Sequence, residues 1–192
     1  YIYIGRDGRD VVWSLYNHHS NANQLWYEAL NDTPGRGGPP IEPPGKPVRD
    51  YFLDWLNQDG FPMWPFWENV RTWWEIRNAP NLLMLHFNEL KADMPGEIRR
   101  IAAFLDIPID ESRWDQIIKH CSFDYMKNNA SQSVPAGGVF WDGGAKTFIH
   151  KGTNGRWHDI LTAEDIAQYE QKALAELGPE CAHWLTNGGA VT

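Results

Sequence analysis

The sequence predicts an α/β fold with a mostly parallel sheet and flanking helices. Residues 1–4 (YIYI) and 81–87 (NLLMLHF) are two mainly apolar runs, typical of strands that are covered on both faces. Segments with a helical spacing of apolar residues lie between these runs and after the second one. Because strands that alternate with helices usually form a parallel sheet, we expect one α/β domain over residues 1–192.

Composition limits the classes of function. The 192 residues are 42% hydrophobic, which suits one domain with a sizeable core. The net charge of −8 argues against a nucleic-acid-binding protein or a basic membrane-surface protein. Cys121 and Cys181 lack a metal-binding spacing, and no apolar run approaches the length of a membrane span. We therefore predict a cytoplasmic protein without a metal, a nucleic-acid partner or a membrane anchor.

The first segment combines a strand, a charged junction and a helix. Gly5 interrupts the apolar run, and Asp7 is expected to cap a helix with Asp10 as the third residue of an acidic capping box. Arg6 then lies at the carboxyl end of a strand and beside a helix N-terminus, where anions bind. Ser14 follows about two helical turns later. The segment predicts an anion site; alternatively, Arg6 pairs with Asp7 or Asp10, and Ser14 is an ordinary helix residue.

The chain begins inside this strand and without a methionine. Its apolar sequence is typical of a central strand, whose parallel neighbours we expect largely from residues upstream of Tyr1. The sequence is accordingly predicted to be part of a longer chain.

Residues 20–47 are rich in Pro and Gly and are predicted to form a long surface loop. Two helices follow, the first opened by Pro47, with a turn at residues 60–62 (GFP) between them. Each helix carries an apolar stripe that we assign to the core, as we do most of the eleven tryptophans. The stripes comprise Val48, Tyr51, Phe52, Trp55 and Leu56 in the first helix and Phe66, Trp67, Val70, Trp73 and Trp74 in the second.

Three further helices are predicted after the second strand. The first begins at Pro95, Asp110 caps the second, and Ser122 caps a short third helix that ends at Met126. The first of them is expected to have an inward face and a charged outward face. The inward residues are Ile98, Ile101, Ala102 and Leu105, and the outward ones are Glu97, Arg99 and Arg100.

The last third of the chain is predicted to contain a long loop and one long helix. Residues 129–147 contain several Gly and Pro residues without a period and are expected to be loop. Thr162 and Asp165 have the spacing of a capping box for a final helix through Leu177, which the Gly-Pro pair at residues 178–179 should end.

Residues 148–157 (FIHKGTNGRW) differ from their acidic background. Two glycines flank a short loop near Lys146, His150, Lys151 and Arg156, and no other segment has this density of cationic groups. Small residues let the backbone approach a ligand closely while N–H groups and Lys hold anionic oxygens. The loop is therefore a second candidate for anion binding, with a solvated loop and incidental charges as the alternative.

Four segments together resemble cytosolic sulfotransferases, which transfer a sulfuryl group from 3′-phosphoadenosine 5′-phosphosulfate (PAPS) to a hydroxyl or amine. They are the strand, Arg, helix and Ser of the opening, and LLMLHFNELKADMPGEIRRIAAFLDI, CSFDYMKNN and FIHKGTNGRWHDILT. Their order matches that of the family over its C-terminal two-thirds. The resemblance implies a P-loop-like sulfotransferase fold that lacks its N-terminal portion here.

The resemblance also implies a cofactor site. Arg6, Ser14, Lys151 and the backbone of Gly152 match the positions that hold the 3′-phosphate of the cofactor. A forked Arg, a Lys and adjacent N–H groups suit a phosphate dianion. His150 stands where the family has Arg, so this phosphate contact is expected to gain charge only toward the usual His pKa of about 6.5.

Aromatic positions complete the predicted cofactor site. Phe123 and Phe148, and Phe87 where the family often has Tyr, are expected to contact the adenine ring of PAPS or of its product, adenosine 3′,5′-bisphosphate. Cys121 occupies a position near the base that is usually Thr. No metal is implied.

The catalytic residues are not assigned. The family's phosphosulfate-binding loop, its catalytic Lys and its general-base His precede the position of Tyr1, and neither His18 nor His19 is assigned as a base. A non-catalytic module that binds an anionic nucleotide remains an alternative function. A kinase-like protein is disfavoured because the chain has no G-x-x-x-x-G-K-[ST] loop.

A small-molecule acceptor is the expected partner. Trp13, Trp26 and the Pro/Gly loop could line a pocket for a flat aromatic acceptor, although aromatic walls also bind sugars and sterols. His158 and Ala167 replace a Lys and a Glu of the family's dimerisation segment, so the oligomeric state stays open.

Overall fold

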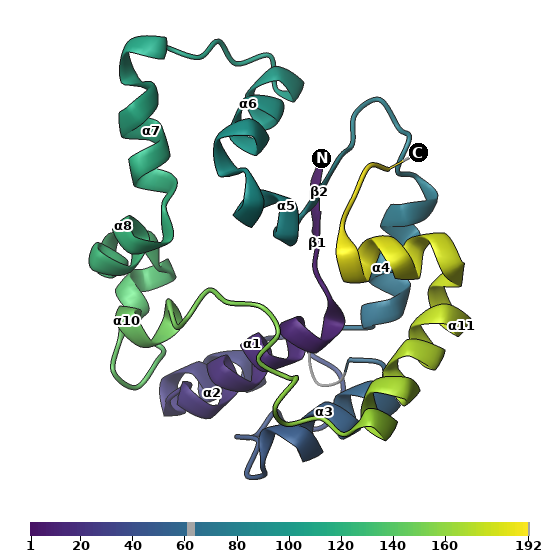
Figure 1. Cartoon of the computed structure of the whole chain (residues 1–192). Coiled ribbons are helices and arrows are strands. Elements are labelled where there is room, and N and C mark those ends of the chain that lie inside the picture. The colour runs from purple at the N-terminus through teal and green to yellow at the C-terminus, as the bar shows by residue number, and fades with distance from the viewer. Residues whose placement is uncertain (61–63, 192) are drawn as a thin grey trace.

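The computed structural model describes residues 1–60 and 64–191, and two parallel strands lie near the middle of this structure (Figure 1). β1 (Ile2–Gly5) pairs with β2 (Leu83–His86), and the register runs from Ile2 opposite Leu83 to Gly5 opposite His86. The predicted α/β class with a parallel sheet is confirmed. The predicted turn at residues 60–62 lies mostly outside the described residues.

The prediction that the first strand is covered on both faces is wrong for the described chain. Ile2 and Ile4 share one face of β1 and are 44% and 48% exposed. Tyr3, on the other face, packs against the rings of Trp73 and Trp184 at centroid distances of 5.5 and 6.5 Å. The strand is thus covered from one side only, by helices α4 (Phe66–Glu75) and α11 (Ala163–Asn187).

Gly5 belongs to the strand and does not interrupt it. A Cβ atom at this position would lie 2.3 Å from the ring of Trp184, so a side chain would displace the helix that covers β1. Glycine is required there because of this close approach.

The first helix, α1 (Gly8–Asn21), begins as predicted with Asp7 as its N-cap, which accepts a hydrogen bond from the backbone N–H of Arg9. The capping box with Asp10 is wrong. Asp10 instead accepts a hydrogen bond from the backbone N–H of Gly155, 145 residues away, at 2.8 Å. The fold uses this carboxylate to join two distant segments.

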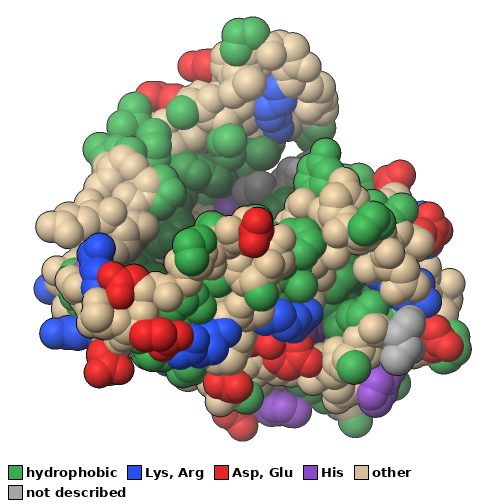
Figure 2. All heavy atoms as spheres, turned by 90° about the horizontal axis from the view of Figure 1, so that it is seen from above, with side chains coloured by type: hydrophobic (Ala, Val, Ile, Leu, Met, Phe, Trp, Pro, Cys, Tyr) green, Lys and Arg blue, Asp and Glu red, His purple; other side chains and the backbone are tan. Residues whose placement is uncertain are grey.

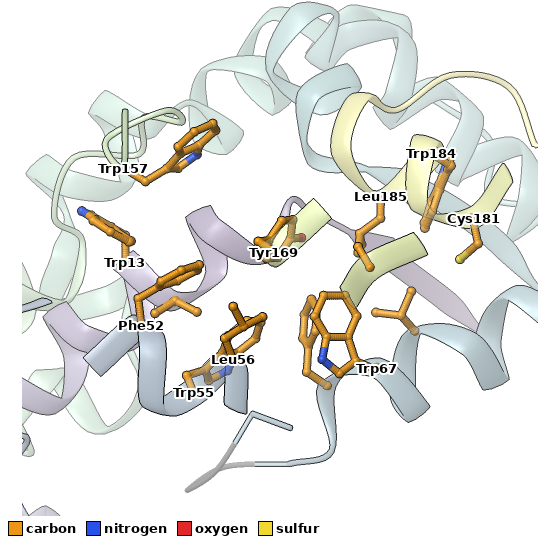
Figure 3. Packing of buried hydrophobic residues seen from close by; sticks show 14 of the residues in the cluster. Trp13, Phe52, Trp55, Leu56, Trp67, Trp157, Tyr169, Cys181, Trp184 and Leu185 are labelled. Carbon is orange, nitrogen blue, oxygen red and sulfur yellow. The ribbon is translucent and has the colours of Figure 1, made fainter. Parts of the chain in front are cut away.

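Helices α1, α3 (Val48–Asn57), α4 and α11 surround a core made largely of aromatic rings (Figure 3). The predicted stripes of α3 and α4 are in this core, with Val48, Trp73 and Trp74 partly buried at its edge. Its rings contact one another at centroid distances such as 4.8 Å for Trp55 and Phe66. The buried rings are Trp13, Tyr51, Phe52, Trp55, Phe66, Trp67, Trp157, Tyr169 and Trp184.

Residues 20–47 are not loop throughout, contrary to prediction. After α1 ends at Asn21, a second helix, α2 (Gln24–Asn31), follows. Asn23 caps it by accepting from the N–H of Trp26, and Tyr27 is buried. This cap and one buried ring outweigh the Pro and Gly content, which is confined to residues 34–47.

Helices α5 (Phe87–Ala92), α6 (Met94–Phe104) and α7 (Trp114–Cys121), with the short helix η1 (Glu111–Arg113), lie on the side of the sheet away from α11 (Figure 1). The predicted inward face of α6 is wrong: no described residue of α6 is buried, and Leu105 is 47% exposed. Glu97 was expected outside, but its side chain is 14% exposed because it pairs with Arg100, which donates to the backbone oxygen of Met84. Seen from above, the molecule has a hollow that hydrophobic side chains border (Figure 2).

Residues 129–147 contain short helices and are not simply loop. After α8 (Phe123–Asn128), capped by Ser122 as predicted, come α9 (Ala130–Ser133), η2 (Pro135–Gly138) and α10 (Ala145–Phe148). They enclose a small cluster of buried residues, Ala130, Val134 and Ala145. This cluster supplies the apolar contacts that the irregular sequence did not indicate.

The final helix, α11, has the predicted capping box of Thr162 and Asp165. Its first helical segment ends at Leu177 as predicted, because Gly178, with φ of 71° and ψ of 170°, is not helical. A second helical segment from Pro179 to Asn187, which was not predicted, carries Trp184 over β1. Proline suits the first position of a helix because no hydrogen-bond donor is needed there, so Pro179 can open this second segment.

Among the described residues, no helix combines the length and apolar composition that crossing a membrane requires. The same residues include no group of three or more His, Cys, Asp or Glu side chains placed to hold a metal ion.

Candidate functional site

All residues that the sequence predicted for the cofactor site line one pocket of about 300 Å³. The pocket, here called the phosphate pocket, lies where the carboxyl end of β1 meets α1, α5, α8 and the loop after α10. The predicted residues in its lining are Arg6, Ser14, Phe87, Phe123, Phe148, His150, Lys151 and Gly152. Residues up to 146 positions apart in sequence, Arg6 and Gly152, are therefore neighbours in space.

Arg6 faces the loop of residues 152–156 rather than a carboxylate of its own segment. Its Nη2 and Nε donate to Oδ1 of Asn154 at 2.8 and 3.2 Å, and Nη2 also approaches the backbone oxygen of Thr153 at 3.4 Å. Asp7 pairs with Arg9 instead, at 2.6 Å. The alternative in which Arg6 pairs with Asp7 or Asp10 as an ion pair is not what the structure shows.

The loop that carries Lys151 is held in place by polar contacts from three directions. Asp10 accepts from the N–H of Gly155, and Asn154 donates to Oδ1 of Asn88 at 2.6 Å. Lys127 donates to the backbone oxygen of His150 at 2.6 Å. The loop is thus positioned before any ligand arrives, which lowers the ordering cost of binding.

Gly152 brings the backbone into the pocket. Its φ is +61°, and a Cβ atom there would lie 2.6 Å from the ring of Phe123. Both the left-handed conformation and the close ring favour glycine. The backbone can therefore approach a ligand where a side chain would block it.

Ser14 and Lys151 keep their polar atoms available. Neither side chain makes a hydrogen bond or ion pair with any residue in the described ranges, and Lys151 is exposed. An ammonium and a hydroxyl at one pocket wall can both donate to an anion.

His150, unlike Lys151, has a polar contact within the protein. Its Nδ1 contacts Oδ1 of Asn17. Burial lowers the pKa of His150, and the nearby charges of Arg156, Lys151 and Lys127 lower it further. The pKa of His150 therefore lies below its usual value, and its imidazole gains charge only at lower pH.

The three phenylalanines lie on different walls of the phosphate pocket. Phe87 is covered by the guanidinium of Arg6, whose Cζ lies 4.2 Å from the ring centroid. Phe148 packs against His18 and Trp141, with both ring centroids 4.6 Å away. The pocket therefore offers flat apolar surface beside cationic groups, which suits a ligand with a ring and an anionic group.

The sequence did not single out several residues of this pocket. Asn17 lies one turn after Ser14 on the same helix face, a spacing that could have indicated it. Asn154 and Asp10 act across more than 140 residues, so no local pattern signals their contacts. Arg156 was noted only as part of the cationic loop, and it also lines the pocket.

Two histidines of α1 are shielded from solvent, His18 in part and His19 almost completely. His18 lines the phosphate pocket, its Nδ1 is buried without a hydrogen-bond partner among the described residues, and burial followed by the charge of His150 lowers its pKa. His19 is 1% exposed, and its Nδ1 lies 2.9 Å from the hydroxyl of Tyr51. Neither position is assigned as a general base.

Two other pockets are less suited to a phosphate. The larger of the two, about 650 Å³, lies between β2, α6 and the C-terminal residues and is lined by Arg77 and Arg100 but also by Glu89, Asp93 and Glu97. A second, about 380 Å³, is bordered by the proline-rich loop. The tryptophans suggested for an acceptor pocket differ: Trp13 is 6% exposed in the core, and Trp26 packs against His19 and Tyr27.

The fold and the phosphate pocket define an α/β protein that can hold an anion between cationic and aromatic side chains. The family model described as sulfotransferase domain matches residues 1–178. The chain therefore belongs to the sulfotransferase family, and the predicted membership is confirmed.

Named relatives agree. The chain is 30% identical over 172 residues to mouse (Mus musculus) sulfotransferase 1B1, a match that covers 88% of this chain and 51% of the relative. It is also 30% identical over 173 residues to rat (Rattus norvegicus) sulfotransferase 1A1, with 88% and 52% covered. The chain spans about half the length of the curated relatives it matches.

Solved structures share the fold. Mouse sulfotransferase SULT7A1, whose structure is complexed with PAP (adenosine 3′,5′-bisphosphate), superposes with a TM-score of 0.73 at 20% identity. The match covers 96% of this chain and 61% of that one. Retinol dehydratase in complex with androsterone and inactive cofactor PAP gives a TM-score of 0.68 at 27% identity, covering 92% and 46%.

Proposed function

We propose that this chain forms the nucleotide-binding part of a sulfotransferase that moves a sulfuryl group from PAPS to a hydroxyl or amine of a small acceptor. The observation that carries this proposal is the meeting of Arg6, Ser14, Lys151 and Gly152 in one pocket. The complex of a 27% identical relative, retinol dehydratase, with the inactive cofactor PAP supports it.

The 3′-phosphate of the cofactor is the anion that we assign to these residues. A phosphate dianion needs donors from several directions, and here the Arg6 fork, the Lys151 ammonium, the Ser14 hydroxyl and backbone N–H groups face one pocket. Arg6 already donates to the amide oxygen of Asn154, so its guanidinium is oriented before the ligand binds. This arrangement favours a fixed phosphate position.

The adenine ring is assigned to the aromatic walls of the same pocket. Phe123 and Phe148 line it, and Phe87 lies under the Arg6 guanidinium. Stacking on such rings contributes affinity for a base without requiring a specific hydrogen bond. The rings therefore supply affinity, and the cations select a nucleotide with a 3′-phosphate.

In the proposed transfer, the acceptor oxygen or nitrogen attacks sulfur as the bond from sulfur to the 5′-phosphate oxygen breaks. A base takes the acceptor proton, and adenosine 3′,5′-bisphosphate leaves with the electron pair of the broken bond. This in-line displacement resembles phosphoryl transfer, in which positioning and charge stabilisation dominate. The described residues bind and orient the nucleotide, and none is assigned to the proton transfer.

A titration tests this proposal. Adenosine 3′,5′-bisphosphate and adenosine 5′-monophosphate are added to the protein and to Arg6→Ala and Lys151→Ala, with circular dichroism to confirm folding. We expect binding that requires the 3′-phosphate and is weakened about tenfold or more in each variant. Equal affinity of the folded protein for both nucleotides would contradict the proposal.

The acceptor is tested separately, with PAPS as donor and a panel of phenols, sterols and sugars. We propose a flat aromatic acceptor, because Trp141 packs against the pocket-lining Phe148 and adds a ring to those assigned to adenine. Faster turnover of the non-aromatic acceptors would contradict this choice.

A further inference from the structure

Arg156 lies in the phosphate pocket and has no polar partner among the described residues. It lines the pocket together with Arg6, Ser14 and Lys151. Its Nε is buried, and its side chain makes no hydrogen bond or ion pair with any residue in the described ranges. A half-buried cation in this state loses hydration and gains no counter-charge from the protein.

Several other arginines of the chain have a carboxylate partner within 3.5 Å. Among them are Arg9, Arg49, Arg71, Arg99 and Arg100. The carboxylate of Asp10, which is close to this pocket, is already bound to the N–H of Gly155. Arg156 is therefore a cation that the fold leaves available inside a pocket.

The backbone of Arg156 is fixed on both sides. The preceding residue, Gly155, donates to Asp10 at 2.8 Å. The following residue, Trp157, is 7% exposed, and its ring centroid lies 4.0 Å from Cζ of Arg9. These anchors hold Arg156 at the pocket wall, so its position does not depend on a flexible loop.

His150 lines the same pocket, and its polar atoms are partly engaged. Its Nδ1 contacts Oδ1 of Asn17. The positive charges nearest to His150 are those of Arg156, Lys151 and Lys127, and each favours the neutral imidazole. His150 can donate or accept a hydrogen bond here, but it adds no charge at pH 7.

We propose that Arg156 binds the phosphate group that enters this pocket. The inference rests on the proposed function, because it concerns the same 3′-phosphate. Its ligand class is a nucleotide with a phosphate monoester at the 3′ position. Together with Arg6 and Lys151, Arg156 surrounds that dianion with three cations.

The test compares Arg156→Gln with Arg113→Gln, which removes the same charge from an exposed residue of η1 outside the pocket. Each variant and the unmodified protein are titrated with adenosine 3′,5′-bisphosphate and adenosine 5′-monophosphate, and thermal unfolding checks that each is folded. We expect Arg156→Gln to weaken bisphosphate binding about tenfold or more. Monophosphate binding, and both affinities of Arg113→Gln, should stay within about twofold.

Arg156→Lys extends the test, because it keeps the charge but loses the forked donor. It should recover part of the affinity. Bisphosphate affinity unchanged in Arg156→Gln but lost in Arg6→Ala would overturn the role of Arg156 and leave the proposed function intact. If the unmodified protein binds the bisphosphate no more tightly than the monophosphate, both the role of Arg156 and the proposed function would be overturned.

Discussion

The aromatic core and the phosphate pocket are built by opposite means. In the core, fully buried residues such as Phe52, Trp67 and Tyr169 contact one another through their rings. In the pocket, Lys151 and Arg156 have no hydrogen-bond or ion-pair partner among the described residues, and a few hydrogen bonds between distant segments hold the walls. Burial of apolar surface stabilises the first region, whereas the second keeps polar groups available at a cost in stability.

This difference separates folding from binding. Removing a core ring leaves a cavity and takes away buried surface, so the whole domain loses stability. Removing an unpartnered cation takes away no interaction within the protein, so the fold should be unchanged while ligand affinity falls. Substitutions in the two regions therefore test the distinction.

The largest effect is expected in the core. Phe52→Ala removes a side chain that is 0% exposed and contacts Trp13, Trp55 and Tyr169. We expect the free energy of unfolding to fall by about 3–5 kcal/mol, measured by urea denaturation. Leu174→Ala, at a 53% exposed position of α11, is the control and should change it by less than about 0.5 kcal/mol. Similar losses in the two variants would show that the core is not where the structure places it.

The second prediction concerns how stability depends on pH, through the buried His19. Burial, followed by the charge of His18, lowers the pKa of His19 from 6.5 to about 4. Because the folded state holds this imidazole neutral, the contribution of His19 to the free energy of unfolding is complete above about pH 6.5. This contribution is lost as the pH falls through about 4. The loss is about 3 kcal/mol.

The measurement is the free energy of unfolding between pH 7.5 and pH 4 for the protein and for His19→Gln, which cannot titrate. The variant should be less stable at pH 7.5 but should lose less stability in acid. His120→Gln, at an exposed position, is the control and should follow the unmodified protein. Identical slopes in all three would mean that His19 is not held neutral.

Lys151→Ala examines the pocket side. We expect bisphosphate affinity to fall about tenfold or more, because a charge-assisted contact is lost, while urea denaturation shows an unchanged free energy of unfolding. Lys146→Ala removes an equal charge from an exposed residue of α10 that does not line the pocket, and it should leave both quantities unchanged. A destabilised Lys151→Ala would remove the contrast between the two regions.

Gly152→Ala should have the smallest effect. The added methyl group would meet the Phe123 ring at 2.6 Å in a backbone conformation with φ of +61°. We expect several-fold weaker bisphosphate binding and a stability loss of about 1 kcal/mol. Gly35→Ala, with φ of +80° and no atom within 4 Å, imposes backbone strain alone and should leave binding unaffected. Equal binding by both variants would show that the backbone at Gly152 does not approach the ligand.

Many features that depend on residues close together in the sequence were predicted correctly, whereas most features that depend on distant residues were not. The caps at Asp7, Ser122 and Thr162 and the stripes of α3 and α4 depend on residues a few positions apart, and the structure has them. The exposed face of β1 could not be predicted, because an apolar run does not say which of its faces another element covers. Composition also gave a wrong prediction at α2: the Pro and Gly content of residues 20–47 indicated a loop, but one cap and one buried ring suffice for a helix there.

The candidate site shows the same limit. The pocket positions were predicted from short motifs and from a resemblance, and the structure brings them together. The contacts that orient them were missed, since Arg6 meets Asn154 and Asp10 meets Gly155 across more than 140 residues. Only a folded chain shows which polar groups are partnered and which, like Arg156, are left for a ligand.

A crystal structure of the protein with adenosine 3′,5′-bisphosphate tests the central claim most directly. The 3′-phosphate should lie within hydrogen-bonding distance of Arg6, Lys151 and Arg156, with the adenine ring against Phe123 or Phe148. A nucleotide bound instead in the larger pocket between β2 and the C-terminal residues, or with its 3′-phosphate in solvent, would contradict the account.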